Sequence, residues 1–157
     1  MKSFFAAALM ILPVLIAAVV SYWPSREIPP RGSSVVLFLP VNVHGTGDVG
    51  DLANALPSEL AAYLGNIREL QTKTTPASLQ VGSSSNGYSR IAEEYGANLL
   101  VLAALTSDSG LLQLNVQVID PKTHRITWSN AYQSPRAKYS EMIRVAGEGL
   151  KRVFESH

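Results

Sequence analysis

Apolar residues recur along this chain with two different periods, and the alternation of these periods predicts the order of its elements. Continuous apolar runs and strict alternation predict strands, whereas apolar positions three or four residues apart predict helices. Strands are predicted over five segments: 35–39, 70–73, 99–105, 112–118 and 125–132. Helices are predicted over three segments: 51–64, 88–95 and 139–154. The expected order of elements is therefore β-α-β-α-β-β-β-α.

This order predicts the α/β class with a mixed five-stranded sheet. The β-α-β crossovers give parallel pairs, and the three strands within residues 99–132 give an antiparallel meander. Pro57 falls inside the first helical segment, so that the helix either kinks or begins there. Residues 81–87 are rich in Ser and Gly and are interpreted as a flexible spacer. One domain is expected over residues 35–157, which is long enough to build its own core.

The amino-terminal segment is apolar enough to enter a membrane. Residues 4–20 carry no charged side chain, and two aromatic residues behind them extend the run to about the length of a bilayer core. Residues 1–24 are therefore predicted to be a transmembrane anchor or uncleaved signal, followed by a linker over residues 25–34. The proposed anchor residues are Phe4, Leu9, Leu12, Leu15, Val19, Tyr22 and Trp23. The alternative is a signal peptide that is cleaved near Ser21.

The flanking charges give only a weak indication of membrane orientation. Lys2 lies on one side of the apolar segment, and Arg26 and Arg31 lie on the other. We expect the carboxyl-terminal domain to be extracytoplasmic, attached to the bacterial inner membrane and facing the periplasm. The alternative location is a protein secreted to the periplasm after cleavage. The Pro-containing linker spans at most about 30 Å, which keeps the domain close to the membrane surface.

Composition excludes several classes of function. The chain has 157 residues, a formal charge of +1 and no Cys, so that disulfides, thiolate metal sites and a Cys nucleophile are absent. Charge is unevenly distributed, with a net −5 over residues 33–120 and a net +4 over residues 121–157. We interpret this as a basic carboxyl-terminal helix that pairs with an acidic body, or as a bipolar surface that steers a partner. Nucleic acid is not an expected partner, because aromatic and basic residues do not interleave.

A glycine-rich segment carries the sharpest local motif. Residues 45–50 read G-T-G-D-V-G after a predicted strand and before a predicted helix, which is the context of a dinucleotide fingerprint. Glu69 lies where a ribose-binding acid would be expected. Asp48 argues against this function, because its carboxylate would face a pyrophosphate. A small-ligand or nucleotide-sensing loop over residues 42–50 is kept as the alternative function, and the simplest interpretation is a connection in which Asp48 or Asp51 caps the helix.

The remaining residues form no catalytic or metal-binding pattern. His44, His124 and His157 are isolated and fall in loops or at the terminus, without the spacing of metal ligands. Glu93 and Glu94 are interpreted as the solvated face of a short helix. The sequence therefore predicts that the protein is not an enzyme and needs no cofactor and no metal.

Four segments together resemble one known family. These segments, in chain order, are VVLFLPVNVHG, LANALPSELAAYL, IAEEYGANLLVLAAL and LLQLNVQVIDPKTHRITWSNAY. They resemble the TolB amino-terminal-like domain of bacterial periplasmic proteins and of some membrane-spanning regulators. The family's Pro-Phe-x-Asn-like turn corresponds here to Pro40, Val41 and Asn42. Val41 departs from the usual aromatic residue, and Pro57 enters the first helix.

The resemblance implies a non-catalytic domain that acts by contacting other proteins of the cell envelope. Together with the apolar segment, it predicts a membrane-anchored interaction module, or an accessory or assembly subunit. The expected partner is an envelope or membrane protein, alone or within a larger membrane complex, and the oligomeric state is left open. The candidate contact residues are Asn42, His44 and Asp48, because they lie in the glycine-rich segment beside a predicted strand end.

Overall fold

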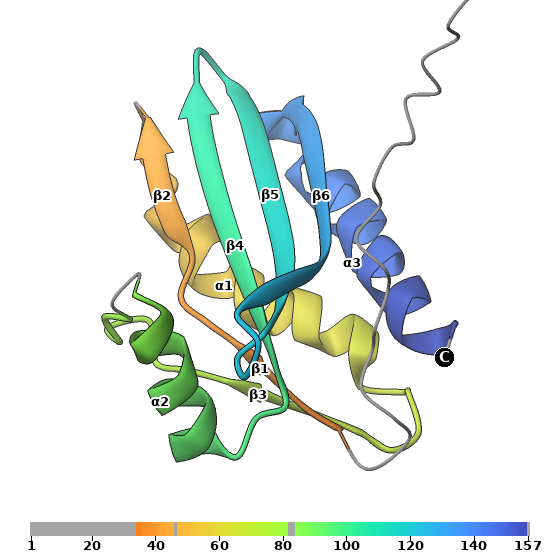
Figure 1. Ribbon diagram of the computed structural model, residues 1–157. Coiled ribbons are helices and arrows are strands. Elements are labelled where there is room, and N and C mark those ends of the chain that lie inside the picture. Colours follow the sequence, from red (N-terminus) through yellow and green to blue (C-terminus); the bar gives the residue numbers. More distant parts are fainter. Residues whose placement is uncertain (1–33, 46, 82–83, 157) are drawn as a thin grey trace, which may run out of the picture.

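The computed structural model describes residues 34–45, 47–81 and 84–156 (Figure 1). Its elements, in chain order, are β1 Ser34–Phe38, β2 Asn42–Gly45, α1 Gly50–Leu64, β3 Leu70–Thr74, α2 Ser85–Tyr95, β4 Leu99–Asp108, β5 Leu111–Asp120, β6 Arg125–Pro135, the 3-10 helix η1 Arg136–Lys138 and α3 Tyr139–Glu155. Every helix and strand expected from the apolar pattern is present, with ends displaced by a few residues.

The strands form one mixed sheet in the order β3-β1-β4-β5-β6. β1 pairs in parallel with both β3 and β4, whereas β4, β5 and β6 form an antiparallel meander. The parallel pairs are joined through α1 and α2, as the crossover rule requires. The α/β class and the mixed sheet with five strand positions are thereby confirmed.

The first strand position is divided into two pieces, which the sequence pattern did not indicate. β2 lies in the segment that was expected to be a loop, and it pairs in parallel with β4 beyond the point where β1 ends. Phe38 is opposite Val101 and Asn42 is opposite Ala104, so that the register shifts by one residue across the break. Pro40 lies inside this break, and it has no N–H with which to continue a ladder.

The helices cover the two faces of the sheet unequally, as Figure 1 shows: α1 and α3 pack behind β4, β5 and β6, and α2 lies in front of one end. The large core between α1, α3 and the sheet contains the alternate apolar residues of three strands, among them Phe38, Leu105 and Leu114. A smaller core beneath α2 contains Leu37 and Leu100. Among the described residues, no helix covers the other end of the α2 side of the sheet.

Local residues explain where the helices start and stop. α1 begins at Gly50, seven residues before the buried Pro57, so the alternative that the helix starts at Pro57 is wrong. Val49 is its N-cap residue and no side chain caps it, although Asp48 Oδ1 accepts a hydrogen bond from the Gly50 N–H at 3.4 Å. The expected Asp cap is therefore also wrong, because Val49 and not an Asp occupies the N-cap position.

The segment interpreted as a spacer contributes to α2. Ser84 is the N-cap residue, and its Oγ accepts from the Gly87 N–H at 3.3 Å. Gly96 ends the helix with a φ of +64°, a left-handed conformation that glycine adopts without strain. The spacer is thus shorter than expected, because the Ser-rich run contains a helix cap.

The proposed anchor lies outside the described residues. All of Phe4, Leu9, Leu12, Leu15, Val19, Tyr22 and Trp23 fall within residues 1–33. Within the described ranges, no helix has both the length and the apolar character needed to cross a bilayer.

Candidate functional site

The end of the sheet that α2 leaves uncovered is the first candidate site. We call this surface the open face, and its residues come from β2, β4, β5 and β6. Those of β4, β5 and β6 alternate with residues of the large core, which places them on the opposite side of the sheet, and Asn42 and His44 of β2 are opposite Ala104 and Thr106 of β4. The open face consists of Asn42, His44, Ala104, Thr106, Gln113, Asn115, Gln117, Ser129, Ala131 and Gln133.

Strand register aligns these residues in rows across the sheet. One row runs from His44 through Thr106 and Gln113 to Gln133. The neighbouring row runs from Asn42 through Ala104 and Asn115 to Ala131. Residues that are paired across neighbouring strands direct their side chains to the same face. Four strands therefore build one continuous surface.

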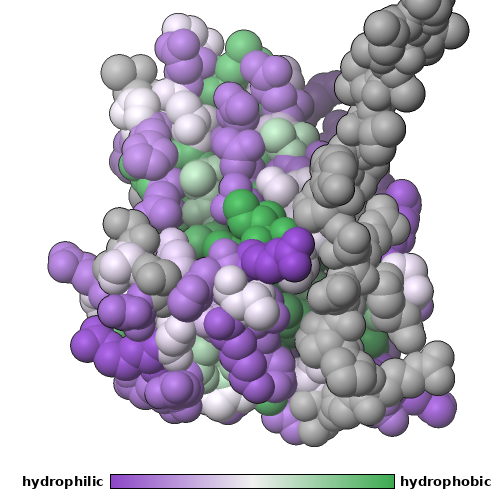
Figure 2. Space-filling model, viewed as in Figure 1, coloured by the Kyte–Doolittle hydropathy of each residue, from purple (hydrophilic) through white to green (hydrophobic). Residues whose placement is uncertain are grey.

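The open face contains amide, hydroxyl and small apolar side chains and the imidazole of His44, and no Asp, Glu, Lys or Arg. Figure 2 shows this region, in the upper part of the view, as mostly purple and white residues. Uncharged groups lose less hydration energy than ions when a partner covers them, and the centres of protein interfaces are depleted of charged residues. The surface is chemically suited to protein contact.

The structure brings two of the three predicted contact residues together. Asn42 and His44 are exposed and two residues apart on β2, and both lie on the open face. Asp48 lies beyond the end of β2 in the loop that leads to α1. Its main-chain carbonyl accepts a hydrogen bond from Arg136 Nη2 at 2.6 Å, which ties the loop to η1. Asp48 is therefore separated from the other two by the end of the strand.

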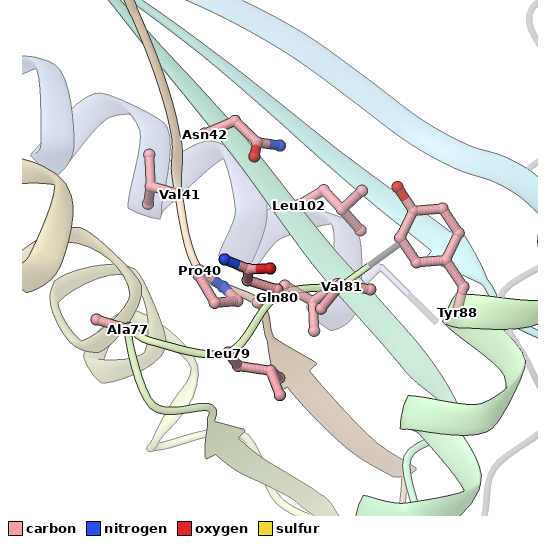
Figure 3. A pocket seen from close by; sticks show the side chains of 10 residues that line it. Pro40, Val41, Asn42, Ala77, Leu79, Gln80, Val81, Tyr88 and Leu102 are labelled. Atoms are coloured by element: carbon pink, nitrogen blue, oxygen red, sulfur yellow. The ribbon is translucent and has the colours of Figure 1, made fainter. Parts of the chain in front are cut away.

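A cavity lies on the α2 side of the break between β1 and β2 (Figure 3). Its volume is about 410 Å³. Seven of its ten lining residues are apolar, and Asn42, Gln80 and Tyr88 add polar side chains, but most of the surface that the cavity exposes is polar. The complete lining is Leu39, Pro40, Val41, Asn42, Ala77, Leu79, Gln80, Val81, Tyr88 and Leu102. We call this the large cavity.

A second cavity of about 70 Å³ lies on the α1 side of the same break. Ala53, Asn54, Pro57 and Ser58 of α1 form one wall, and Thr74 and Thr75 at the end of β3 form another. Pro40, Val41 and Ala77 line both this small cavity and the large cavity. The break in the first strand is therefore bordered by one cavity on each side of the sheet.

Sequence reasoning missed the cavities and most of the open face. The alternation in β5 does mark Gln113, Asn115 and Gln117 as one exposed side, and this signal could have located part of the open face. The large cavity joins residues 39–42 to residues 77–81, which are brought together only by tertiary packing.

A Ser–His pair is the arrangement closest to a catalytic one in the described residues. Ser89 Oγ lies 2.8 Å from His124 Nε2, which is the distance of a nucleophile and its base. Ser89 Oγ also donates to the Pro121 carbonyl at 2.8 Å. This second bond directs the hydroxyl proton at a carbonyl and away from the imidazole, so the geometry is that of a bond between α2 and the β5–β6 turn.

The dinucleotide arrangement is not assembled in the described residues. Glu69 immediately precedes β3, and Leu70 is opposite Ser34 at the start of β1. The glycine-rich segment follows the other end of β1, so that the acid and the loop lie at opposite ends of the parallel strands. Within the described residues, no group of three or more His, Asp or Glu side chains could hold a metal ion.

No protein-family model and no curated protein matches the sequence. Among solved structures, the carboxyl-terminal domain of LpoB from Salmonella enterica matches with a TM-score of 0.55 at 18% identity, covering 68% of this chain and 85% of that one. TolB from Acinetobacter baumannii matches with a TM-score of 0.53 at 12% identity, over 80% of this chain and 28% of that one. The chain has the TolB amino-terminal-like fold.

A third structure with this fold is PelC from Paraburkholderia phytofirmans, which was solved as a dodecamer. It matches with a TM-score of 0.55 at 12% identity, over 80% of this chain and 93% of that one. In this chain, the residues that resemble the turn of the TolB amino-terminal-like family have a definite place. Pro40 and Val41 lie in the break between β1 and β2, Asn42 begins β2, and all three residues line the large cavity.

Proposed function

We propose that this protein is a membrane-anchored, non-catalytic module of the bacterial cell envelope, which binds another envelope protein through the open face. The observation that carries the proposal is a four-stranded surface without charged side chains that no helix of the described chain covers. A protein partner can cover such a surface without desolvating an ion.

The fold supports an accessory role. The TolB amino-terminal-like resemblance implies an envelope domain that acts by contact, and PelC shares the fold and was solved as a dodecamer. The fold is therefore compatible with a large assembly. The apolar run of residues 4–20 supports an anchor, and the short linker behind it favours a partner at the same membrane. The proposal puts the domain on the periplasmic side.

Site-specific photo-crosslinking tests this function. A photoreactive phenylalanine analogue is placed at Gln113 or Gln133 on the open face, or at Val145 on the exposed side of α3 as the control. The chain is produced from its own gene, and the membrane fraction is irradiated. We expect one discrete adduct with an envelope protein from the two open-face positions and none from Val145.

A matched variant separates a true interface from proximity. Gln113→Glu places one charge on the open face, and Arg144→Glu reverses one on the outer side of α3. Only Gln113→Glu is expected to reduce the adduct formed from Gln133. No adduct from either open-face position, or the same adduct from Val145, would overturn the proposed function.

A further inference from the structure

We propose that the outer edge of β2 receives an extended segment of the partner protein as an added strand, with its alternate side chains in the large and small cavities. This inference rests on the proposed function, and it assigns the chemistry of the recognised segment. The segment has large apolar and small residues in alternation, followed by a basic residue.

β2 offers a strand edge beside which the described chain places no strand. It pairs with β4 on one side only. β3, which occupies the neighbouring position beside β1, ends at Thr74 opposite Phe38. The Thr75 N–H still bonds to the Phe38 carbonyl at 3.1 Å, and the chain then turns away toward α2. Figure 1 shows β2 at the left edge of the sheet.

The two cavities are arranged as a strand requires. Successive side chains of a strand point to opposite faces of its sheet. The large cavity opens on the α2 side of the break, between Tyr88 and Leu102, and the small cavity opens on the α1 side, against Ala53 and Pro57. A strand added beside β2 can therefore direct one side chain into each. The volumes of about 410 and 70 Å³ favour a large residue on one side and a small residue on the other. Leu79 and Leu102 in the wall of the large cavity offer apolar contact to that large residue.

Charge near the end of β2 indicates the basic residue. Asp48 is exposed in the segment that joins β2 to α1, and Asp51 is exposed in the first turn of α1. Arg136 lies beside Asp48 and donates to its main-chain carbonyl, but no ion pair between described residues involves either carboxylate. α1 contains Asp51 and Glu59 and no Lys or Arg. A segment that extends past Gly45 meets this acidic end, so that a Lys or Arg on it gains a complementary charge.

Strand addition explains why the recognition would be selective. Main-chain hydrogen bonds to an edge provide affinity without regard to sequence, and pockets for alternate side chains provide specificity. β2 has only four residues, so its ladder is short and the cavities must supply much of the binding energy.

The test uses the full chain purified in detergent and three fluorescent peptides. The first, KTLALALTK, alternates Leu and Ala between Lys ends; the second, KTLLAALTK, has the same composition without alternation; and the third, ETLALALTE, reverses the end charges. Fluorescence anisotropy gives each dissociation constant. We expect the alternating basic peptide to bind about tenfold more tightly than the second, because one additional buried Leu accounts for such a difference. It should also bind more tightly than the third, because the acidic ends of that peptide are repelled by Asp48 and Asp51.

Two neighbouring substitutions test the position of the site. Ala77 is exposed and lines both cavities, whereas Ser78 is exposed in the same turn and lines neither. Ala77→Trp is expected to weaken binding of KTLALALTK about tenfold and Ser78→Trp to leave it unchanged, with equal melting temperatures. Equal binding of the first two peptides, or equal effects of the two substitutions, would overturn the inference. If the peptide results overturn the inference but the crosslinked adduct from Gln113 is still formed, the proposed function is retained and only the strand addition is rejected.

Discussion

Gly147 on α3 faces the ring of Tyr63 on α1 with no room for a side chain between them. A Cβ atom at Gly147 would lie 2.5 Å from Tyr63 Cγ, well inside van der Waals contact. Gly147 is buried, and its contact lies in the layer where α1 and α3 pack on the sheet. The absence of a side chain at residue 147 therefore sets the separation of the two helices that support the open face from behind.

Gly147→Ala is expected to destabilise the protein. Overpacking costs about 1–3 kcal/mol, which exceeds the gain of about 1 kcal/mol from the higher helix propensity of Ala. Chemical denaturation of the native chain and the variant measures the difference. Tyr63→Ala removes the ring that the new Cβ atom would meet. In a chain that already carries Tyr63→Ala, the loss of unfolding free energy caused by Gly147→Ala should therefore largely disappear. An equal cost in both backgrounds would contradict the steric explanation.

Tyr139 connects α3 to α1 through its hydroxyl group. Tyr139 Oη lies 2.8 Å from Glu59 Oε2 and 3.2 Å from the Leu52 carbonyl, and its single proton can serve one acceptor at a time. Burial raises the pKa of Tyr139 above its ordinary value, and the hydrogen bond and negative charge of Glu59 raise it further. The folded state therefore favours the protonated phenol.

The raised pKa of Tyr139 determines how the stability of the protein should depend on pH. Because the pKa of Tyr139 is higher in the folded than in the unfolded chain, its contribution to stability is complete below about pH 10 and is lost as the pH rises above that value. Tyr139→Phe should cost about 1 kcal/mol at neutral pH and should reduce the loss of stability in alkali. Urea denaturation between neutral pH and pH 11 tests this. A variant with the same alkaline loss as the native chain would rule out Tyr139 as its source.

Arg136 is expected to order the loop before α1. Its Nη2 donates to the Asp48 carbonyl at 2.6 Å, next to the buried Val49. Arg136→Ala should accelerate amide hydrogen exchange over residues 47–53 and should cost less than about 1 kcal/mol in global stability, since the bond is exposed. Arg136→Lys retains a donor and should show a smaller effect. Faster exchange throughout α1 and α3 would instead indicate a global loss of stability.

Much of this fold follows from local patterns, and the exceptions have physical causes. The alternation in Leu112, Leu114 and Val116 is set by burial of one sheet face, so it predicts β5 directly. β2 has four exposed residues and includes Gly45, so that no apolar pattern marks it. It is a strand because its backbone pairs with β4, whose residues lie about sixty positions further along the chain.

The candidate site was predictable only in part for the same reason. Asn42 and His44 could be chosen as polar residues beside a strand end, but their row with Gln113 and Gln133 depends on the register of four strands. The cavities depend on the one-residue shift at Pro40 and on the path of residues 75–81. The expected pairing of the basic helix with the acidic body fails in the described residues, where Arg144 and Lys151 both pair within α3.

Asn130 is expected to protect the outer edge of β6 from self-association. Its Oδ1 accepts from the Ala131 N–H at 2.9 Å, and its Nδ2 donates to the Tyr132 hydroxyl at 3.1 Å. In an edge strand, every second residue directs its N–H group away from the sheet. Ala131 and Pro135 both belong to this outward-directed set of β6, and Pro135 has no N–H group to expose. Residues 126–134 contain no charged side chain, so that this edge has little other protection.

Asn130→Ala should therefore expose an outward N–H and increase association between copies of the chain. Sedimentation velocity at several concentrations should give a larger weight-average sedimentation coefficient for this variant than for the native chain. Tyr132→Phe removes the other hydrogen bond of Asn130 and leaves the Ala131 N–H covered, so it should behave like the native chain. Asn130→Asp retains an acceptor and adds a repulsive charge to the edge, so it should not associate more than the native chain. Association by Tyr132→Phe, or none by Asn130→Ala, would assign the protection to other residues of the edge.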